Sequence, residues 1–466
     1  FSRGRASVNH ATVLMPWLNL AADMNGDNSA DDDINNTAEG VAPGLVLGSG
    51  ARRKLKLICR PNPLWAGKVK LTASRATGAT GHIKVFRDGD STPIIDTGAA
   101  TPDMSEEWDL TTTLRFGDIS AGLYWVEGTG VVSTPGEIEL TLGYEPPVGV
   151  SAHPGDPATD LPLCKEDKLL VTVLKVEFKE GAACSGFDGK FETPPALAVV
   201  KGKTNTVKAE ISPAGAVSSV FFKSQDAAKA SVAPSQASST PQTLTVSGID
   251  EVETQIDAKL GSLTGQTCAS LKTEVFKEVA VKVAFHLIAD DANDDNVSGA
   301  GDHKTTRTAA AMQGYIDGAN AIWGQYGVKF EILQTGGQDA DTCQMNADFG
   351  TAVDDPPANT EEAQIINQCK NNNADINVYF VWAINPPDAT GYPASKDLFI
   401  QDVLVGNPTA NILAHEAGHL IGVAGDYNGT ETPPHSNSEV MWGAGPVGCE
   451  ISFQDGKKGH DTAEGF

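Results

Sequence analysis

The sequence predicts a multidomain chain in which two antiparallel β-sandwich modules are followed by an α+β domain. In the front half, short runs of alternating apolar and polar residues are separated by Gly, Pro, Asp and Ser turns, which is typical of β-sandwiches. From residue 278 onward, buried strands instead alternate with apolar residues at helical spacing. A chain of 466 residues also has room for three domains of ordinary size.

These composition changes divide the chain into five segments. Residues 1–50 form an N-terminal segment with an acidic loop, and 51–146 form the first sandwich. A Pro-rich linker, 147–164, leads to a second sandwich at 165–277. The later part of this second sandwich, from Val199-Val-Lys-Gly-Lys onward, resembles a bacterial immunoglobulin-like (Ig-like) domain. The α+β domain takes 278–466.

The first sandwich is predicted from six alternating runs, at residues 54–59, 68–74, 82–87, 110–115, 123–127 and 137–142. The second opens with the apolar run Leu169–Leu174. Neither module carries residues of a catalytic pattern. We therefore expect the sandwich modules to act as spacers or to bind a surface or another protein.

Two acidic loops could hold calcium. Asp23, Asn25, Asp27 and Asp31 stand at alternate positions, as calcium-loop ligands do, but Ile34 stands where an EF-hand has its bidentate glutamate. The run 290–295 is similarly acidic. A calcium site and a solvated acidic loop both remain open at each place.

The α+β domain is predicted to begin with a buried strand at 278–289. Apolar residues from Met312 to Tyr326 then recur at helical spacing, and Gly327 closes that helix. Further strands are expected at 328–333, 376–384 and 398–405.

The helix that follows carries the chain's most specific motif. It is expected to begin with Asn407 as N-cap and Pro408 at its first position. Its sequence then contains His415, Glu416 and His419 in an HExxH arrangement. Two histidines four apart lie on one helix face and can reach a single zinc ion, and the glutamate beside the first can take a proton from a metal-bound water.

With Gly422 three residues after His419 and Met441 further on, this stretch resembles the metzincin metallopeptidases, whose pattern is HExxHxxGxxH or D followed by a methionine turn. The resemblance implies a secreted zinc-dependent endopeptidase that cleaves protein or peptide substrates, with Glu416 as general base. It also implies that strand 398–405 borders the cleft and pairs with extended substrate.

The third zinc ligand departs from that pattern. Its expected place, six residues after His419, is Gly425, which has no side chain to donate. Asp426 is the first candidate, and His435 and Glu439 are alternatives. Tyr427 is a candidate for stabilising the oxyanion of the transition state.

This departure motivates a second hypothesis, a non-catalytic extracellular scaffold or adhesive protein with a degenerate peptidase domain. Separate mutation of Asp426 and His435, with zinc binding as readout, distinguishes the two hypotheses.

Bulk properties fit an exported protein. The formal net charge of −26 argues against nucleic acid as a partner, and no run of eighteen apolar residues predicts a membrane span. The 7 cysteines form no CxxC pair and indicate disulfides in an oxidising compartment. We expect Cys343 to pair with Cys369 and Cys184 with Cys268, leaving one cysteine unpaired, with Cys59, Cys164 and Cys449 as candidates.

Overall fold

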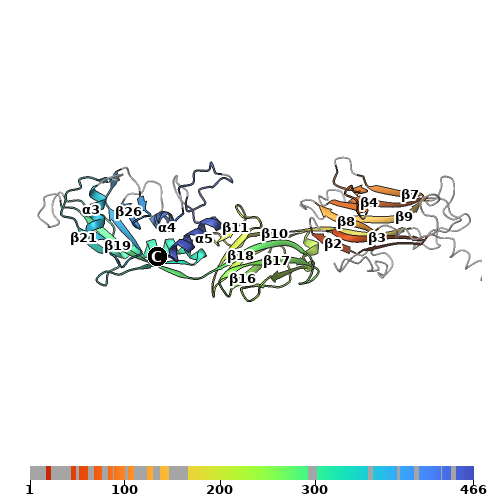
Figure 1. The fold of residues 1–466 in the computed structure, drawn as a ribbon, viewed down its shortest axis with the longest axis horizontal. Helices are drawn as coiled ribbons and strands as arrows, with labels where there is room; N and C mark the ends of the chain where they lie inside the picture. Colours follow the sequence, from red (N-terminus) through yellow and green to blue (C-terminus); the bar gives the residue numbers. More distant parts are fainter. Residues whose placement is uncertain are drawn as a thin grey trace, which may run out of the picture.

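The protein is multidomain and mostly β, and its three bodies follow one another along the long axis of the molecule (Figure 1). The computed structural model describes residues 17–22, 44–48, 52–60, 68–75, 82–87, 89–99, 103–109, 123–129, 137–145, 166–291, 302–354, 360–385, 389–402, 409–423, 425–431, 433–441 and 448–466. Within these residues, no helix is long and apolar enough to cross a membrane.

The first body is a sandwich of two mostly antiparallel sheets. One sheet has the order β1-β3-β8-β5-β6, and the other contains β9, β4 and β7. Alternate leucines, valines and isoleucines of both sheets point inward and form one core, as the alternating runs predict. The strands are β1 (Trp17–Ala22), β2 (Gly44–Gly48), β3 (Arg52–Arg60), β4 (Lys68–Arg75), β5 (His82–Arg87), β6 (Ile95–Asp96), β7 (Ser105–Asp109), β8 (Leu123–Thr129) and β9 (Glu137–Glu145).

Strands β1 and β2 belong to this sandwich, so the predicted boundary at residue 51 is too late. Leu20 of β1 and Leu45 of β2 lie in the core of the first sandwich, together with Leu55 of β3. The predicted strand 110–115, the calcium-type residues Asp23, Asn25, Asp27 and Asp31, and the linker 147–164 lie outside the described residues.

A single long strand, β10 (Glu166–Glu180), joins the first two bodies. Its first half pairs with β9 and, in parallel, with β2. Its second half pairs with β13 of the second sandwich, from Lys175 to Glu180. The two sandwiches therefore share a continuous sheet.

The second sandwich packs the sheet β15-β16-β13-β10 against the sheet β11-β12-β18-β17-β14. Its core includes Phe178, Phe222 and Leu244. The elements are β11 (Phe187–Asp188), β12 (Ala196–Val200), β13 (Thr204–Ser212), η4 (Ala214–Ser219), β14 (Val220–Ser224), β15 (Ala230–Ala233), β16 (Gln242–Gly248), β17 (Val252–Leu260) and β18 (Thr267–Phe276).

The third body is an α/β domain around the sheet β20-β19-β23-β26-β25, in which only β25 is antiparallel to its neighbour. Helices α2, α4 and α5 pack on one face and α3 on the other. The elements are β19 (Val279–Ala289), η5 (Ala309–Ala311), α2 (Met312–Trp323), η6 (Gly324–Tyr326), β20 (Val328–Ile332), β21 (Asp341–Gln344), β22 (Val353–Asp354), α3 (Thr360–Cys369), β23 (Ile376–Val381), β24 (Ile384–Asn385), β25 (Ala389–Tyr392), β26 (Asp397–Gln401), α4 (Thr409–Leu420) and α5 (Phe453–Ala463).

One expectation for this domain needs correction. The predicted strand 398–405 appears as β26, but it lies inside the sheet, where β23 and β25 occupy both of its edges. Because its backbone groups are already paired, β26 cannot add a substrate strand. The strand at this end of the sheet is β25.

The predicted disulfides are half right. Cys343 is bonded to Cys369, as expected. Cys184 instead pairs with Cys449, 265 residues away in the α/β domain, and Cys268 is free. The reason is geometric: Cys268 lies on β18 with its thiol against the carbonyl of Ala258, whereas Cys184 lies in a loop that reaches the α/β domain.

Candidate metal centre

Helix α4 presents the HExxH residues from a fixed position. Its apolar side, including Ile412 and Leu413, is buried in the domain core. The indole nitrogen of Trp323 in α2 donates to the carbonyl of Ala414, 2.8 Å away, and ties the two helices together. His415 and Glu416 are buried on this helix. The expected cap residues at 407 and 408 lie outside the described residues.

Backbone carbonyls orient both histidines. Nδ1 of His415 lies 2.7 Å from the carbonyl oxygen of Val440, and Nδ1 of His419 lies 3.3 Å from that of Val423. A carbonyl oxygen only accepts, so each Nδ1 must carry the proton. In the neutral rings, Nε2 is left as a lone-pair donor, which is the usual outer-shell arrangement of metal-binding histidines.

Both Nε2 atoms converge on one oxygen of Asp426. This Oδ1 lies 3.3 Å from Nε2 of His415 and 3.1 Å from Nε2 of His419. Three lone-pair atoms so close repel one another unless a proton or a cation lies among them. Two imidazoles and one carboxylate are also a donor set of catalytic zinc sites. The residues present therefore fit zinc.

Two glycines explain why Asp426 takes the place that Gly425 leaves empty. Gly422, two residues past the end of α4, has a φ of 94°, and Gly425 has a φ of 73°. Residues with a Cβ rarely adopt these left-handed backbone conformations, so glycine suits both positions. Asp426 directly follows the second glycine, and its side chain lies against the two histidines.

The charges in this cluster support one another. Burial of the His415 ring disfavours its protonation, but the hydrogen bond with Asp426 and the nearby charge of Glu416 outweigh burial and raise the pKa of His415. Hydrogen bonds from His415 and His419 hold the pKa of Asp426 well below its usual range. Asp426 is thus ionised without a metal, and a zinc ion bound here would displace the Nε2 protons that these hydrogen bonds need.

Met441 lies against the helix between the two histidines. It is 1% exposed, and a Cβ built at Gly418 would be only 2.5 Å from its Sδ. The carbonyl of Met441 also accepts from the backbone N–H of Tyr427, 2.9 Å away. The segment around Met441 therefore supports both α4 and the loop that carries Asp426.

The other predicted residues are engaged elsewhere. His435 and Glu439 are partners of each other, and Glu439 also accepts from Lys190, so the structure does not bring either to the His415–His419 pair. The hydroxyl of Tyr427 donates to Asp455. Neither alternative ligand nor the oxyanion role of Tyr427 gains support from this geometry.

Sequence reasoning missed a strand that passes beside Glu416. A Cβ built at Gly391 of β25 would lie 3.5 Å from Oε2 of Glu416, so this strand passes directly beside the glutamate. The four residues Ala389–Tyr392 include a glycine and are too short a run for alternation to predict a strand.

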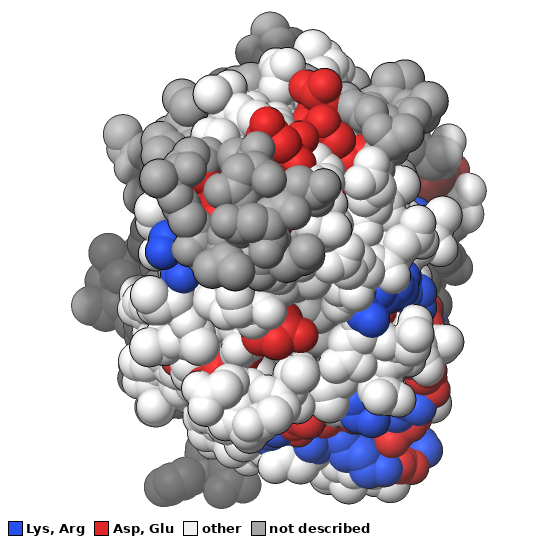
Figure 2. Space-filling model, turned by 90° about the vertical axis from the view of Figure 1, so that its left-hand side faces the viewer, with Lys and Arg blue, Asp and Glu red and all other residues white. Residues whose placement is uncertain are grey.

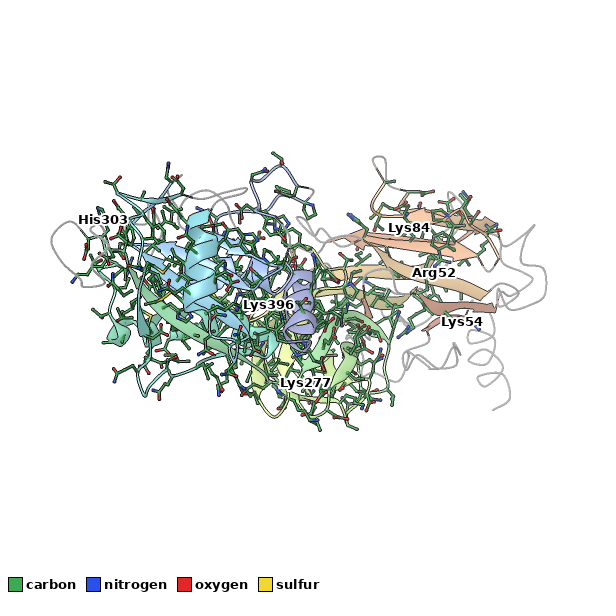
Figure 3. The ribbon with its side chains drawn as sticks, turned by 60° about the vertical axis from the view of Figure 1, so that its left-hand side comes forward. Arg52, Lys54, Lys84, Lys277, His303 and Lys396 are labelled. Carbon is green, nitrogen blue, oxygen red and sulfur yellow. A yellow bond between two sulfur atoms is a disulfide. The ribbon has the colours of Figure 1, made fainter. Side chains whose placement is uncertain are left out.

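A second cluster, formed by Asp290, His303 and Asp348, lies at the outer end of the α/β domain, where His303 is labelled in Figure 3. The carboxylate of Asp290 already accepts from the backbone N–H and the ring of His303 and from the N–H of Phe349. These donors satisfy Asp290 without a cation. Residues 292–295 of the predicted acidic loop lie outside the described residues.

Figure 2 looks onto the free end of the α/β domain. Asp and Glu side chains are scattered over its upper and central parts, and Lys and Arg gather with further acidic residues near one lower corner. The described part of this face therefore presents mixed charge.

No protein-family model matches the chain, and no curated protein matches it in sequence. Among solved structures, it is similar to domains 4 and 5 of the S-layer protein SbsC, with 18% identity, coverage of 32% of this chain and 67% of that chain, and a TM-score of 0.15. Domains 5–6 of the same protein give 14% identity, coverage of 56% and 99%, and a TM-score of 0.15. Such scores carry no functional argument.

Proposed function

We propose that this protein is an extracellular zinc-dependent endopeptidase. The observation that supports this most is the convergence of His415, His419 and Asp426, whose donor atoms lie within 4.8 Å of one another, beside the buried Glu416. When bound there, zinc would activate a water molecule and polarise the scissile carbonyl. The two disulfides fit an oxidising, extracellular compartment.

The protein's own residues then have separate roles. Oε1 of Glu416 lies 4.0 Å from Nε2 of His415, so its carboxylate borders the proposed metal position. It would take a proton from the attacking water and give it to the leaving amine. Strand β25, at the end of the sheet beside Glu416, would pair with an extended peptide and hold its scissile bond near this carboxylate.

The test compares Glu416→Gln with the unchanged chain. We expect about one zinc per chain in both proteins after dialysis against a weak chelator, and a loss of about 10²–10⁴-fold in peptide cleavage for the variant. Glu331→Gln, the same change on β20 at the far edge of the sheet, is the matched control and should leave cleavage unchanged.

Two results would contradict the endopeptidase. If the variant cleaves as fast as the unchanged chain, Glu416 is not the base. If the unchanged chain retains zinc but cleaves no member of a peptide library, the non-catalytic scaffold becomes the better hypothesis.

A further inference from the structure

One loop of the second sandwich reaches across to the α/β domain. This docking segment, residues 184–192, begins at Cys184, which is bonded to Cys449. Asp188, 4% exposed, accepts from the N–H of Phe453 at the start of α5, 2.9 Å away. Glu192 accepts from Gln454, 2.6 Å away. Three separate contacts thus fix the segment against α5 and the chain just before it.

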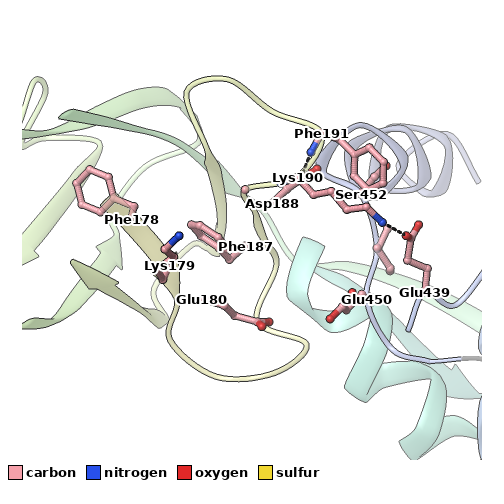
Figure 4. A pocket seen from close by; sticks show the side chains of 12 residues that line it. Phe178, Lys179, Glu180, Phe187, Asp188, Lys190, Phe191, Glu439, Glu450 and Ser452 are labelled. Carbon is pink, nitrogen blue, oxygen red and sulfur yellow. Dashed lines mark hydrogen bonds and ion pairs between the residues drawn. The ribbon is translucent and has the colours of Figure 1, made fainter. Parts of the chain in front are cut away.

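The middle of the docking segment reaches the polypeptide around Met441. Nζ of Lys190 lies 3.2 Å from Oε1 of Glu439, whose side chain is 3% exposed. Figure 4 shows this ion pair across a hollow of about 300 Å³, which is lined by Phe187 from the sandwich and by Ser452 from the α/β domain. Glu439 also accepts from His435 and from the N–H of Ser436, so Lys190 adds a partner from the other module to a buried carboxylate, and this ion pair links the two bodies.

The next residue of the segment begins a stack of three rings. The ring of Phe191 lies 4.4 Å from that of His435, at 19°. The other face of His435 stacks on Tyr427 at 3.6 Å and 13°. Tyr427 directly follows Asp426, the third donor of the candidate metal centre. The stack therefore connects the second sandwich to the metal-binding loop through one residue.

The rest of the loop's anchoring comes from the α/β domain itself. Tyr427 donates its N–H to Met441 and its hydroxyl to Asp455. These bonds fix the backbone and the end of the tyrosine side chain. The face of the ring is covered by His435, which is held in turn by Glu439 and Phe191.

We infer that the second sandwich helps to position the residues of the metal centre. Phe191 is the positioning residue, and it holds the Asp426 loop through the Phe191–His435–Tyr427 stack. This inference rests on the proposed function for its metal but not for its contacts. The α/β domain would then hold zinc with full affinity only when the docking segment lies against it.

The experiment uses the full chain and measures zinc affinity by competition with a chromophoric chelator. Phe191→Ala should weaken zinc binding about tenfold, the lower end of what loss of an outer-shell partner costs. Phe191→Tyr, which keeps a flat ring, should restore it, whereas Phe191→Leu, which keeps only apolar bulk, should not. Phe187→Ala is the matched control, because Phe187 lies in the same segment but packs on the core of the second sandwich.

Hydrogen exchange of the Tyr427 amide gives a second readout that needs no metal. In Phe191→Ala this amide should exchange faster than in the unchanged chain and in Phe187→Ala. Unchanged exchange in Phe191→Ala, or an equal effect of Phe187→Ala, overturns the inference. If the unchanged chain binds no zinc, the proposed function fails, and the exchange arm still decides whether Phe191 positions the loop.

Discussion

A pair of Gly→Ala substitutions tests how tightly α4 is held between Met441 and α2. At Gly418, a new methyl group would lie 2.5 Å from Sδ of Met441 and 3.0 Å from Cζ2 of Trp323. Trp323 is fully buried and bonded through its indole nitrogen, so it has little freedom to move. At Gly314 of α2, which is exposed, a new Cβ would meet no atom within 4 Å.

The magnitudes follow from two opposing effects. Replacing glycine by alanine inside a helix stabilises it by up to about 1 kcal/mol. Overpacking a close-packed core costs about 1–3 kcal/mol. We therefore expect Gly314→Ala to stabilise the α/β domain by up to ~1 kcal/mol and Gly418→Ala to destabilise it by about 0–3 kcal/mol.

The assay is urea unfolding monitored by hydrogen exchange of the α2 and α4 amides. These amides report on the α/β domain separately from the sandwiches. Zinc affinity of Gly418→Ala should also fall where the displaced Met441 shifts its neighbour Val440, whose carbonyl orients His415. If Gly418→Ala stabilises the domain as much as Gly314→Ala, the reasoning about this packing is wrong.

Two further predictions concern the second sandwich. Burial opposes ionisation of Asp257, but hydrogen bonds with Gln255, Lys259 and Ser270 outweigh burial and lower the pKa of Asp257. The ionised carboxylate therefore stabilises the fold above about pH 3.9, and this stabilisation is lost as pH falls through the folded pKa. Asp257→Asn should therefore cost about 1–3 kcal/mol at pH 7 in urea unfolding and progressively less in acid; a cost independent of pH would refute this. Burial raises the pKa of the Cys268 thiol to about 12, so alkylation at pH 8, followed by mass spectrometry, should be about a thousandfold slower in the native than in the unfolded protein; equal rates would contradict it.

Local patterns predicted the elements that carry their own periodicity. The predicted strand 278–289 and the helix from Met312 to Gly327 correspond closely to β19, α2 and η6, because apolar spacing and a terminal glycine are local signals. Helices α3 and α5 were not predicted. Helix α5 contains glycines at 456 and 459, which pack against Tyr326 and Trp323, so tertiary packing overrides weak helix propensity there.

At the candidate site, too, local spacing predicted some residues, while others depended on the tertiary fold. Spacing within one helix sufficed to place His415, Glu416 and His419 together, but the third donor depended on how the chain turns after Gly422. The sequence left Asp426, His435 and Glu439 open because loop geometry is not periodic. The docking segment was beyond prediction, since its contacts join residues 265 positions apart.

Strand β10 has a mechanical consequence for the whole molecule. Its 15 residues, at ~3.3 Å each, form a rod of about 50 Å that is hydrogen-bonded into both sandwiches. A hinge between the sandwiches would have to break this rod. Because the docking segment fixes the next junction, a rotation of the first sandwich would carry the α/β domain with it, so the orientation of the first sandwich would set the direction in which the candidate site faces.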